Sequence, residues 1–388
     1  MFAMTLSNAG LQRRKLGVLG DRNHYKQRAL LVFLTCFSSV LCAKSQEPST
    51  LLPGPKPADI RADWKPWIGD YGPLKEPRVV LERDGHLFLF NQIKEWQLNE
   101  VSPGSFAIAA SNEPDAPLVR ISRQLSGGLV LITGKMSLDR LDYGIDAKDV
   151  ARINPVRSIE VLRIEALAAS PPIETGEFRK SELVELNPLD PSIHLDIRYA
   201  TANDFLGTPV YSQARAFLQR PAAKALVRIQ QKLKALGYGL LIHDAYRPWY
   251  VTKIFWDATP PEGKIFVADP AQGSRHNRGC AVDLTLYDLA SGKSVEMPGT
   301  YDEMSPRSFP SFPGGTSLQR WHRDLLRRAM ESEGFTVYES EWWHFDYKDW
   351  KEYRILNVPF EKLDSVGGSG LAHQQNIQMI SGRFSLEN

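Results

Sequence analysis

The chain of 388 residues is too long for one average domain and fits two once a targeting segment is set aside. Its composition, 43% hydrophobic and 24% charged, is typical of a globular protein that buries a core. The 26 prolines and 28 glycines indicate a loop-rich mixed structure and argue against a helical bundle.

The first 45 residues are typical of an export signal. Basic side chains are frequent between positions 13 and 28, and the apolar run over residues 29–41 that follows is too short for a comfortable membrane span. Ala43-Lys44-Ser45 offers small residues for cleavage before Gln46. We therefore expect a signal peptide over 1–45 and an exported protein, periplasmic or extracellular. Leu41-Cys42 matches a lipoprotein box poorly, so a lipid anchor is the less favoured alternative.

Without this segment the chain carries 40 basic and 44 acidic side chains, a net charge of −4. Binding to nucleic acid requires a basic face, so this partner class receives no support. No later stretch approaches the roughly 18 apolar residues of a membrane helix. Cys280 is the only cysteine left after the signal, which excludes an internal disulfide. Its small neighbours favour a buried packing role over a nucleophile or ligand.

Residues 46–62 form a proline-rich spacer, and residues 63–167 read as a small all-β domain of unknown role, a sandwich or open barrel. The aromatic residues Trp64, Trp67 and Tyr71 at its start are expected to plug its core, with a ligand-stacking platform as the alternative. We find no cluster of titratable residues in this domain and predict no chemistry there. The expected strands cover residues 78–82, 87–91, 105–109, 118–122 and 129–133.

A linker over 168–184 leads to a second domain at 185–365, followed by a flexible tail at 366–388. Residues 222–236 and 318–333 keep helical spacing, the second helix with Ser317 as its expected cap. Helices packed on a mainly antiparallel sheet, an α+β fold, are therefore expected. The strand-like segments are 195–199, 239–243, 282–286, 336–338 and 343–347.

Three short patches in this domain contain the parts of a hydrolytic zinc site. His276 and Asp283 are seven residues apart in a loop that enters a strand, and His344 completes three protein ligands that leave a position for water. Glu341 is suited to act as general base, because that role needs a carboxylate near the metal but not on it. Arg247 offers a cation for the developing oxyanion.

Taken together, the patches resemble D-alanyl-D-alanine dipeptidases of the VanX type, within the zinc D,D-peptidase superfamily that includes D,D-carboxypeptidases and the hedgehog domain. The resemblance covers about residues 185–360. It implies a zinc D,D-peptidase/hedgehog-like fold, one zinc ion on His276, Asp283 and His344, Glu341 as base, and Arg247 at the oxyanion. Its motifs are IRYATANDF at 197–205, DAYRP at 244–248, SRHNRGCAVD at 274–283 and EWWHF at 341–345.

The resemblance also implies how substrate is held. The family binds the free amino group of its dipeptide with an aspartate, which aligns with Asp302, and Tyr301 stands where the family usually has phenylalanine. Ser274 and Tyr199 match positions that line the substrate pocket. Asp244 has either a role in orienting the Arg247 loop or a plain structural one.

Three histidines outside these roles receive weaker interpretations. We expect His243 to be a core or supporting histidine rather than a fourth ligand. His322 is expected to be solvated on its helix, and His194 has no motif around it.

These patterns predict an exported zinc dipeptidase that hydrolyses D-Ala-D-Ala and related D-dipeptides by attack of a metal-bound water. A D,D-carboxypeptidase or endopeptidase acting on peptidoglycan stem peptides is the nearer alternative, and a requirement of Asp302 for a free amine distinguishes the two. A non-catalytic cell-wall-binding protein is the alternative from another class. The expected partner is a small D-dipeptide, with peptidoglycan as a second candidate through residues 63–167.

Overall fold

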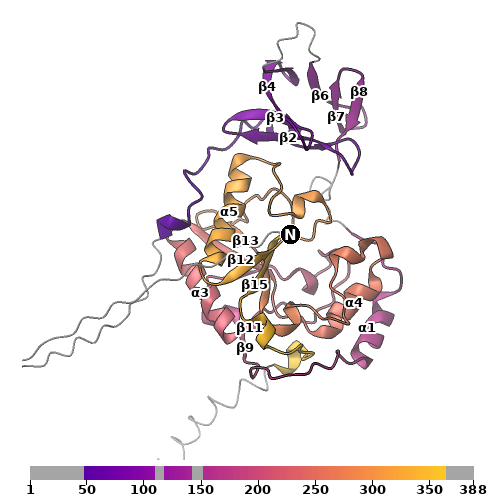
Figure 1. Ribbon diagram of the computed structural model, residues 1–388, viewed down its shortest axis with the longest axis vertical. Coiled ribbons are helices and arrows are strands. Elements are labelled where there is room, and N and C mark those ends of the chain that lie inside the picture. The colour runs from indigo at the N-terminus through magenta and orange to yellow at the C-terminus, as the bar shows by residue number, and fades with distance from the viewer. Residues whose placement is uncertain (1–47, 110–117, 142–151, 364–388) are drawn as a thin grey trace, which may run out of the picture. The chain divides into compact units, whose positions relative to one another are not determined.

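The computed structural model describes residues 48–109, 118–141 and 152–363, so the expected signal peptide and C-terminal tail lie outside the described residues (Figure 1). The described chain contains two large sheets and five α-helices. Among the described helices, none combines the length and apolar character needed to cross a membrane.

The first sheet has eight strands, each paired antiparallel with the next along the chain. A bridge between Tyr71 and Arg140 joins the first strand to the end of the last, so the sheet curls toward closure. Trp64 and Tyr71 are buried in its core, as expected. The strands are β1 (Gly69–Tyr71), β2 (Arg78–Arg83), β3 (His86–Phe90), β4 (Glu95–Ser102), β5 (Ser105–Ile108), β6 (Val119–Arg123), β7 (Leu129–Thr133) and β8 (Met136–Asp139).

The second sheet has five strands in the order β10-β12-β13-β15-β14. All of its pairs are antiparallel except β10 with β12, which confirms the expected α+β class with a mainly antiparallel sheet. The strands β9 (Leu183–Glu185) and β11 (Phe217–Gln219) form a separate, short antiparallel pair. The five strands are β10 (His194–Leu195), β12 (Tyr238–Asp244), β13 (Ala281–Asp288), β14 (Phe335–Tyr338) and β15 (Glu341–Tyr347).

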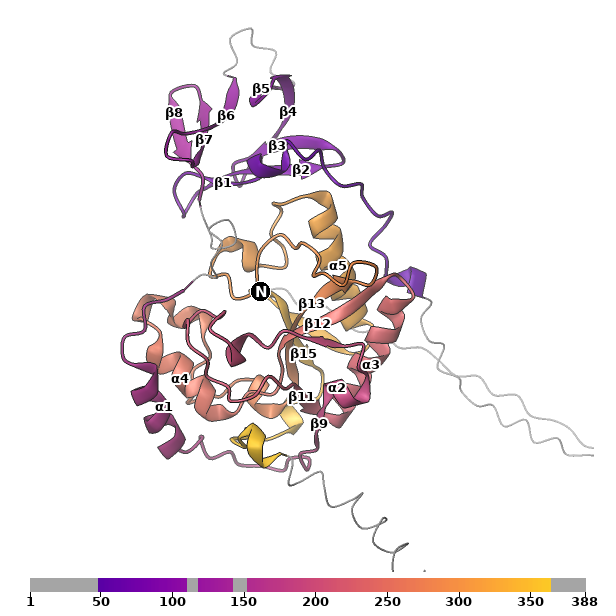
Figure 2. The same cartoon turned by 180° about the vertical axis from the view of Figure 1, so that it is seen from behind.

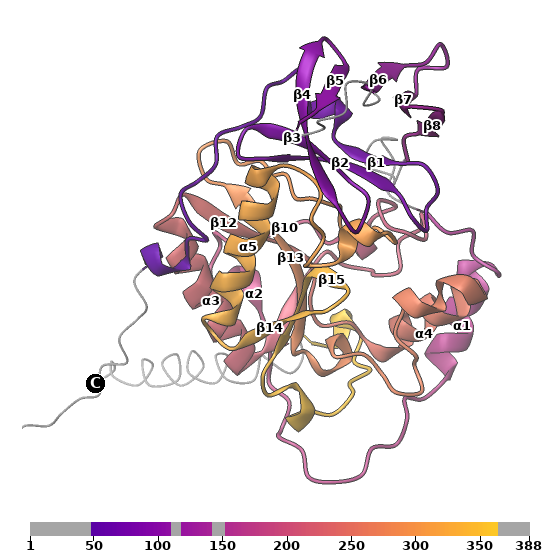
Figure 3. The ribbon, with the colours of Figure 1, turned by 45° about the horizontal axis from the view of Figure 1, so that its top comes forward.

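Two amphipathic helices, α3 (Arg220–Lys234) and α5 (Ser317–Glu331), pack against this sheet (Figure 3). The expected cap of α5 is wrong by one residue, because the cap is Thr316. Its hydroxyl accepts a hydrogen bond from the Gln319 N–H at 3.0 Å, and the Gln319 side chain accepts one from the Thr316 N–H at 2.8 Å. This reciprocal pair is a capping box, and it makes Ser317 the first helical residue.

Three further helices were not among the expected elements. Helix α1 (Ile159–Ala168) packs on α4 (Trp249–Ala258), and the two lie together away from α3 and α5 (Figure 2). Helix α2 (Leu186–Leu189) is a single turn. The buried residues of α4 lie on most of its faces, so its sequence lacks the one-sided periodicity that identifies α3 and α5.

The register of the second sheet brings three polar residues into one row. Asp244 at the end of β12 pairs with Asp283 in β13, and Asp283 pairs with His344 in β15. The β12–β13 register shifts between Ile242 and Asp244, an irregularity of the kind that re-aims side chains beside active sites. Backbone pairing therefore places residues distant in sequence at one point of the sheet.

Candidate active site

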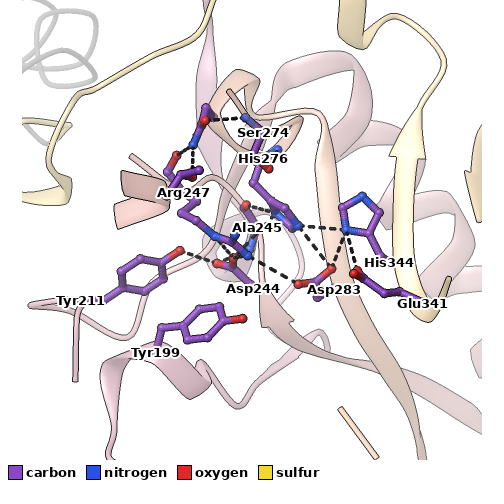
Figure 4. A network of polar contacts seen from close by, with 12 residues as sticks. Tyr199, Tyr211, Asp244, Ala245, Arg247, Ser274, His276, Asp283, Glu341 and His344 are labelled. Atoms are coloured by element: carbon purple, nitrogen blue, oxygen red, sulfur yellow. Dashed lines mark hydrogen bonds and ion pairs between the residues drawn. The ribbon is translucent and has the colours of Figure 1, made fainter. Parts of the chain in front are cut away.

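His276, Asp283 and His344 form one buried cluster. One nitrogen of each imidazole and one carboxylate oxygen lie within 4.8 Å of one another. Asp283 and His344 come from neighbouring strands, whereas His276 lies in a short turn that precedes β13 (Figure 4). Gly279 closes that turn with φ of 67°, a left-handed conformation that glycine adopts without strain.

Hydrogen bonds on the outer side of each imidazole set its tautomer. His276 Nδ1 lies 2.7 Å from the Ala245 carbonyl oxygen, which can only accept, so Nδ1 carries the proton and Nε2 the lone pair. His344 Nε2 lies 3.0 Å from Asp346 Oδ1, which holds the proton of Nε2 and leaves Nδ1 as the nitrogen that can bind either a second proton or a metal ion. The two inward-facing nitrogens, His276 Nε2 and His344 Nδ1, lie 3.1 Å apart, an arrangement that calls for a cation.

Asp283 directs an unbonded oxygen at the same point. Its Oδ1 is buried without a hydrogen bond and lies 3.3 Å from His276 Nε2 and 3.0 Å from His344 Nδ1. Burial opposes ionisation of Asp283, but positive charge beside it, supplied by the two histidines in their protonated form, outweighs burial and holds the pKa of this carboxyl well below its ordinary value. Two imidazoles and a carboxylate are a common ligand set of catalytic zinc, so these residues fit a zinc ion.

Glu341 lies beside this cluster without belonging to it. Its Oε2 is 3.7 Å from His344 Nδ1, and it is not part of the three-residue ligand group. Burial raises the pKa of Glu341 above its ordinary value. A carboxyl group that holds a proton more readily, next to a metal site, is suited to carry that proton between two reacting groups.

Arg247 is buried beside Asp283. Its Nη2 lies 3.9 Å from Asp283 Oδ2, while Nε donates to Asp244 Oδ2 at 2.9 Å and Nη2 forms an ion pair with the same oxygen at 2.8 Å. Tyr211 donates to the other oxygen of Asp244 at 2.7 Å, which fixes this carboxylate (Figure 4). Asp244 thus holds the guanidinium in place, which favours the orienting role over a plain structural one.

The loop of Arg247 and the loop of His276 are tied together. The Arg247 N–H donates to the His276 carbonyl at 3.2 Å, and the Asn277 side chain donates to the Arg247 carbonyl at 2.8 Å. The Ser274 hydroxyl accepts from the His276 N–H at 3.2 Å, so Ser274 supports this turn as well as lying near the cluster.

Asp302 and Tyr199, two of the three residues expected to bind substrate, contact each other. The Tyr199 hydroxyl donates to Asp302 Oδ2 at 2.8 Å. Asp302 adopts φ of 57°, an uncommon left-handed conformation for a residue with a side chain. Burial, with the charge of Asp283 added, raises the pKa of Asp302 well above its ordinary value.

Three contacts to the side chains of the candidate metal ligands were not predicted from the sequence. The Ala245 carbonyl is a backbone group and leaves no sequence signal. Asp346 follows His344 by two residues on one strand, so the two-residue period of a strand places both side chains on one face and could have identified it. The Tyr301 hydroxyl, which donates to Asp283 Oδ2 at 3.1 Å, was noted only as a departure from phenylalanine.

The remaining histidines and Cys280 have structural contacts. His243 is buried and stacks on Tyr301 with ring centroids 4.7 Å apart, outside the ligand group, as expected. The prediction that His322 is solvated is wrong, because it is buried between the Glu296 carbonyl and the Tyr238 hydroxyl, each at 3.3 Å. Cys280 is fully buried, which confirms its packing role.

Comparison with known proteins agrees with this geometry. A family model described as D-ala-D-ala dipeptidase matches residues 179–362. The D-alanyl-D-alanine dipeptidase of Escherichia coli K12 is 35% identical over 187 residues, which are 48% of this chain and 95% of the relative. The chain belongs to this dipeptidase family.

Relatives from other bacteria extend the match. The D-alanyl-D-alanine dipeptidase of Enterococcus faecalis V583 is 36% identical over 193 residues, 44% of this chain and 92% of the relative. That of Streptomyces coelicolor is 34% identical over 194 residues, 45% of this chain and 93% of the relative. The protein is therefore a dipeptidase enzyme. Every candidate site residue falls inside the matched range 179–362, whereas strands β1–β8 lie outside it.

Proposed function

We propose that this dipeptidase is zinc-dependent and hydrolyses D-Ala-D-Ala and related D-dipeptides. The observation that carries the proposal is that two imidazole nitrogens and the unbonded Asp283 Oδ1 lie together at one buried point. Peptidases of this family are zinc-dependent, and the names of the relatives supply the substrate class.

In this mechanism His276, Asp283 and His344 hold the zinc. A zinc ion at such a site supplies Lewis acidity toward the peptide carbonyl and lowers the pKa of a water molecule. Glu341 takes a proton from the attacking water as the water oxygen bonds to the carbonyl carbon. As the C–N bond breaks, Glu341 returns that proton to the leaving amine.

Arg247 stabilises the negative charge that develops on the carbonyl oxygen. Its guanidinium is buried and pre-aligned by Asp244, so no reorganisation is required as the charge grows. Asp302 receives the free ammonium group of the substrate. A buried carboxylate gains most from a full positive partner, and an acylated amine cannot provide one, which selects dipeptides over longer peptides.

One combined experiment tests the proposal. The purified protein is analysed for bound metal and assayed for release of D-Ala from D-Ala-D-Ala and from a muramyl pentapeptide. We expect one zinc per chain, hydrolysis of the dipeptide, and loss of activity in Glu341→Ala. Faster release of D-Ala from the pentapeptide would favour the carboxypeptidase alternative. A protein without metal, or unchanged activity in Glu341→Ala, would overturn the catalytic assignment.

We further propose that the enzyme is exported and scavenges cell-wall dipeptide. The basic region, apolar run and small residues of the first 45 positions support the export. Cell fractionation with N-terminal sequencing of the mature protein tests it. Recovery from the periplasm or medium with an N-terminus at Gln46 is expected, and a cytoplasmic protein that retains residues 1–45 would refute it.

A further inference from the structure

A tyrosine hydroxyl contacts one of the three candidate metal ligands. Tyr301 is buried, and its hydroxyl donates to Asp283 Oδ2 at 3.1 Å. A phenylalanine at this position could fill the same space but could not form this bond, so the hydroxyl adds a contact specific to the Asp283 carboxylate.

The two oxygens of Asp283 consequently have different surroundings. Oδ2 accepts from Tyr301 and has Arg247 Nη2 at 3.9 Å, whereas Oδ1 has no hydrogen bond and faces the two histidines. A carboxylate whose second oxygen is engaged by a donor is held against rotation, and it presents one oxygen to a cation in a fixed direction.

The ring that carries this hydroxyl is held on two sides. It stacks on His243, with ring centroids 4.7 Å apart and planes inclined by 28°, and it meets Trp343 edge-on at 5.6 Å. These contacts restrict the tyrosine to one orientation, so the hydroxyl is delivered to Asp283 by a pre-organised side chain.

The backbone of Tyr301 is held by Glu303. The buried Glu303 carboxylate accepts from both the N–H and the hydroxyl of Thr300 at 2.9 Å. It also accepts from the Ser305 hydroxyl at 2.5 Å and pairs with Arg307 Nε at 3.0 Å. A buried acid with this many partners ties the two ends of the turn together, because each bond would be costly to leave unmade.

We propose that Tyr301 is a positioning residue, whose hydroxyl orients Asp283 so that only Oδ1 is offered to the metal. The inference rests on the proposed metal site and deepens it. Glu303 supports the same turn, which also presents Asp302 to Tyr199. Loss of the hydroxyl therefore affects metal binding alone, while loss of the Glu303 bonds affects metal binding and substrate binding together.

The experiment measures zinc affinity of the full-length exported protein by competition with a chromogenic chelator. Mutation of groups that support metal ligands lowers metal affinity by about 10- to 100-fold, and we expect roughly a tenfold loss in Tyr301→Phe, with the KM for dipeptide at saturating zinc nearly unchanged. Tyr287→Phe is the matched control. Tyr287 is buried on the same strand as Asp283, but its hydroxyl donates to the Ser192 carbonyl at 2.8 Å, so its zinc affinity should stay within twofold of the wild type.

The outcomes separate this inference from the proposed function. If the wild-type protein binds no zinc, the proposed metal site is refuted. If the wild type binds zinc and Tyr301→Phe binds it with the same affinity, only the role of Tyr301 is refuted. Glu303→Gln provides a second measurement if Tyr301→Phe does not fold. It should weaken zinc binding and raise the KM together, and a folded Glu303→Gln enzyme with both values unchanged would refute the support of Tyr301 by this turn.

Discussion

Replacement of Arg247 by lysine tests the oxyanion role most directly. The guanidinium donates to Asp244 through Nε at 2.9 Å and forms an ion pair with it through Nη2 at 2.8 Å, while Nη2 also lies 3.9 Å from Asp283 Oδ2. A lysine has a single ammonium group on an unbranched stem. It can stay with Asp244 or reach a carbonyl oxygen beside Asp283, but it cannot make both contacts in the geometry of the fork.

The expected loss follows from the charge that Arg247 meets only in the transition state. Removing one such donor typically raises the barrier by about 2.7–4 kcal/mol, which corresponds to a fall in kcat of about 10²- to 10³-fold. The KM should change far less, because the substrate carbonyl carries little charge before attack. Zinc affinity should stay within about threefold, since Arg247 is not a member of the ligand group.

The assay is steady-state release of D-Ala from D-Ala-D-Ala at saturating zinc. Arg278→Lys is the control, because Arg278 is also largely buried and ion-paired, to Glu174 at 2.6 Å, but its guanidinium contacts Glu174 and the Tyr353 carbonyl instead of Asp244 and Asp283. A kcat within threefold of the wild type would refute the oxyanion role. A loss confined to KM would instead assign Arg247 to ground-state binding of the substrate.

Three further predictions concern the surroundings of the site. Asp346→Asn removes the carboxylate that fixes the His344 tautomer and should lower zinc affinity about 10- to 100-fold in chelator competition. Asp204 is buried, which raises its pKa from 3.8 to about 6, so the folded state keeps a proton that the unfolded chain releases. Asp204 should therefore contribute a fall of at most ~3 kcal/mol in the free energy of unfolding between pH 4 and 6.5, and in urea titrations the wild-type curve should decline over this range relative to that of Asp204→Asn. Burial raises the pKa of the Cys280 thiol to about 12, so it should not react with a thiol reagent at pH 8 until the protein is unfolded.

Each of these three predictions has an outcome that would contradict it. Asp349→Asn controls for Asp346, since Asp349 pairs with Arg179 and has no contact with a candidate ligand; equal zinc affinities in the two variants would remove the role of Asp346. A wild-type stability that rises between pH 4 and 6.5, with the same slope in Asp204→Asn, would contradict the assignment to Asp204. Rapid reaction of the folded protein that begins at Gln46, whose only cysteine is Cys280, with the thiol reagent would show that Cys280 is accessible.

Much of the second sheet and its site could be predicted from the sequence. Helices α3 and α5 have one-sided periodicity, and β12 and β13 are apolar runs that end in turn signals, so each was placed within about two residues. The ligand residues could be named because they lie in short sequence motifs whose residues and order resemble those of a known peptidase family. Helix α4 could not be predicted in this way, because it is apolar on most faces.

Contacts that depend on the tertiary fold were out of reach. The sequence cannot show that the Ala245 carbonyl meets His276, because the two loops join only through the folded backbone. His322 was misjudged for a similar reason: a polar residue on a helix reads as exposed, and only the packing of α5 against the Glu296 segment buries it. Neither the sequence pattern nor the geometry assigns a role to strands β1–β8, since none of the candidate catalytic residues lies in them.

Asp244, Asp283 and His344 are aligned by strand pairing, so an insertion inside these strands disrupts the site, whereas an insertion in the connections between them does not. One residue inserted into β13 ahead of Asp283 would turn its carboxylate to the opposite face of the sheet, because side chains alternate along a strand. Insertions between β13 and α5 leave that pairing intact, provided that the turn of Tyr301 and Asp302 is spared. Homologues of this enzyme should therefore accumulate insertions and deletions in the connections, while the spacing inside these three strands stays fixed.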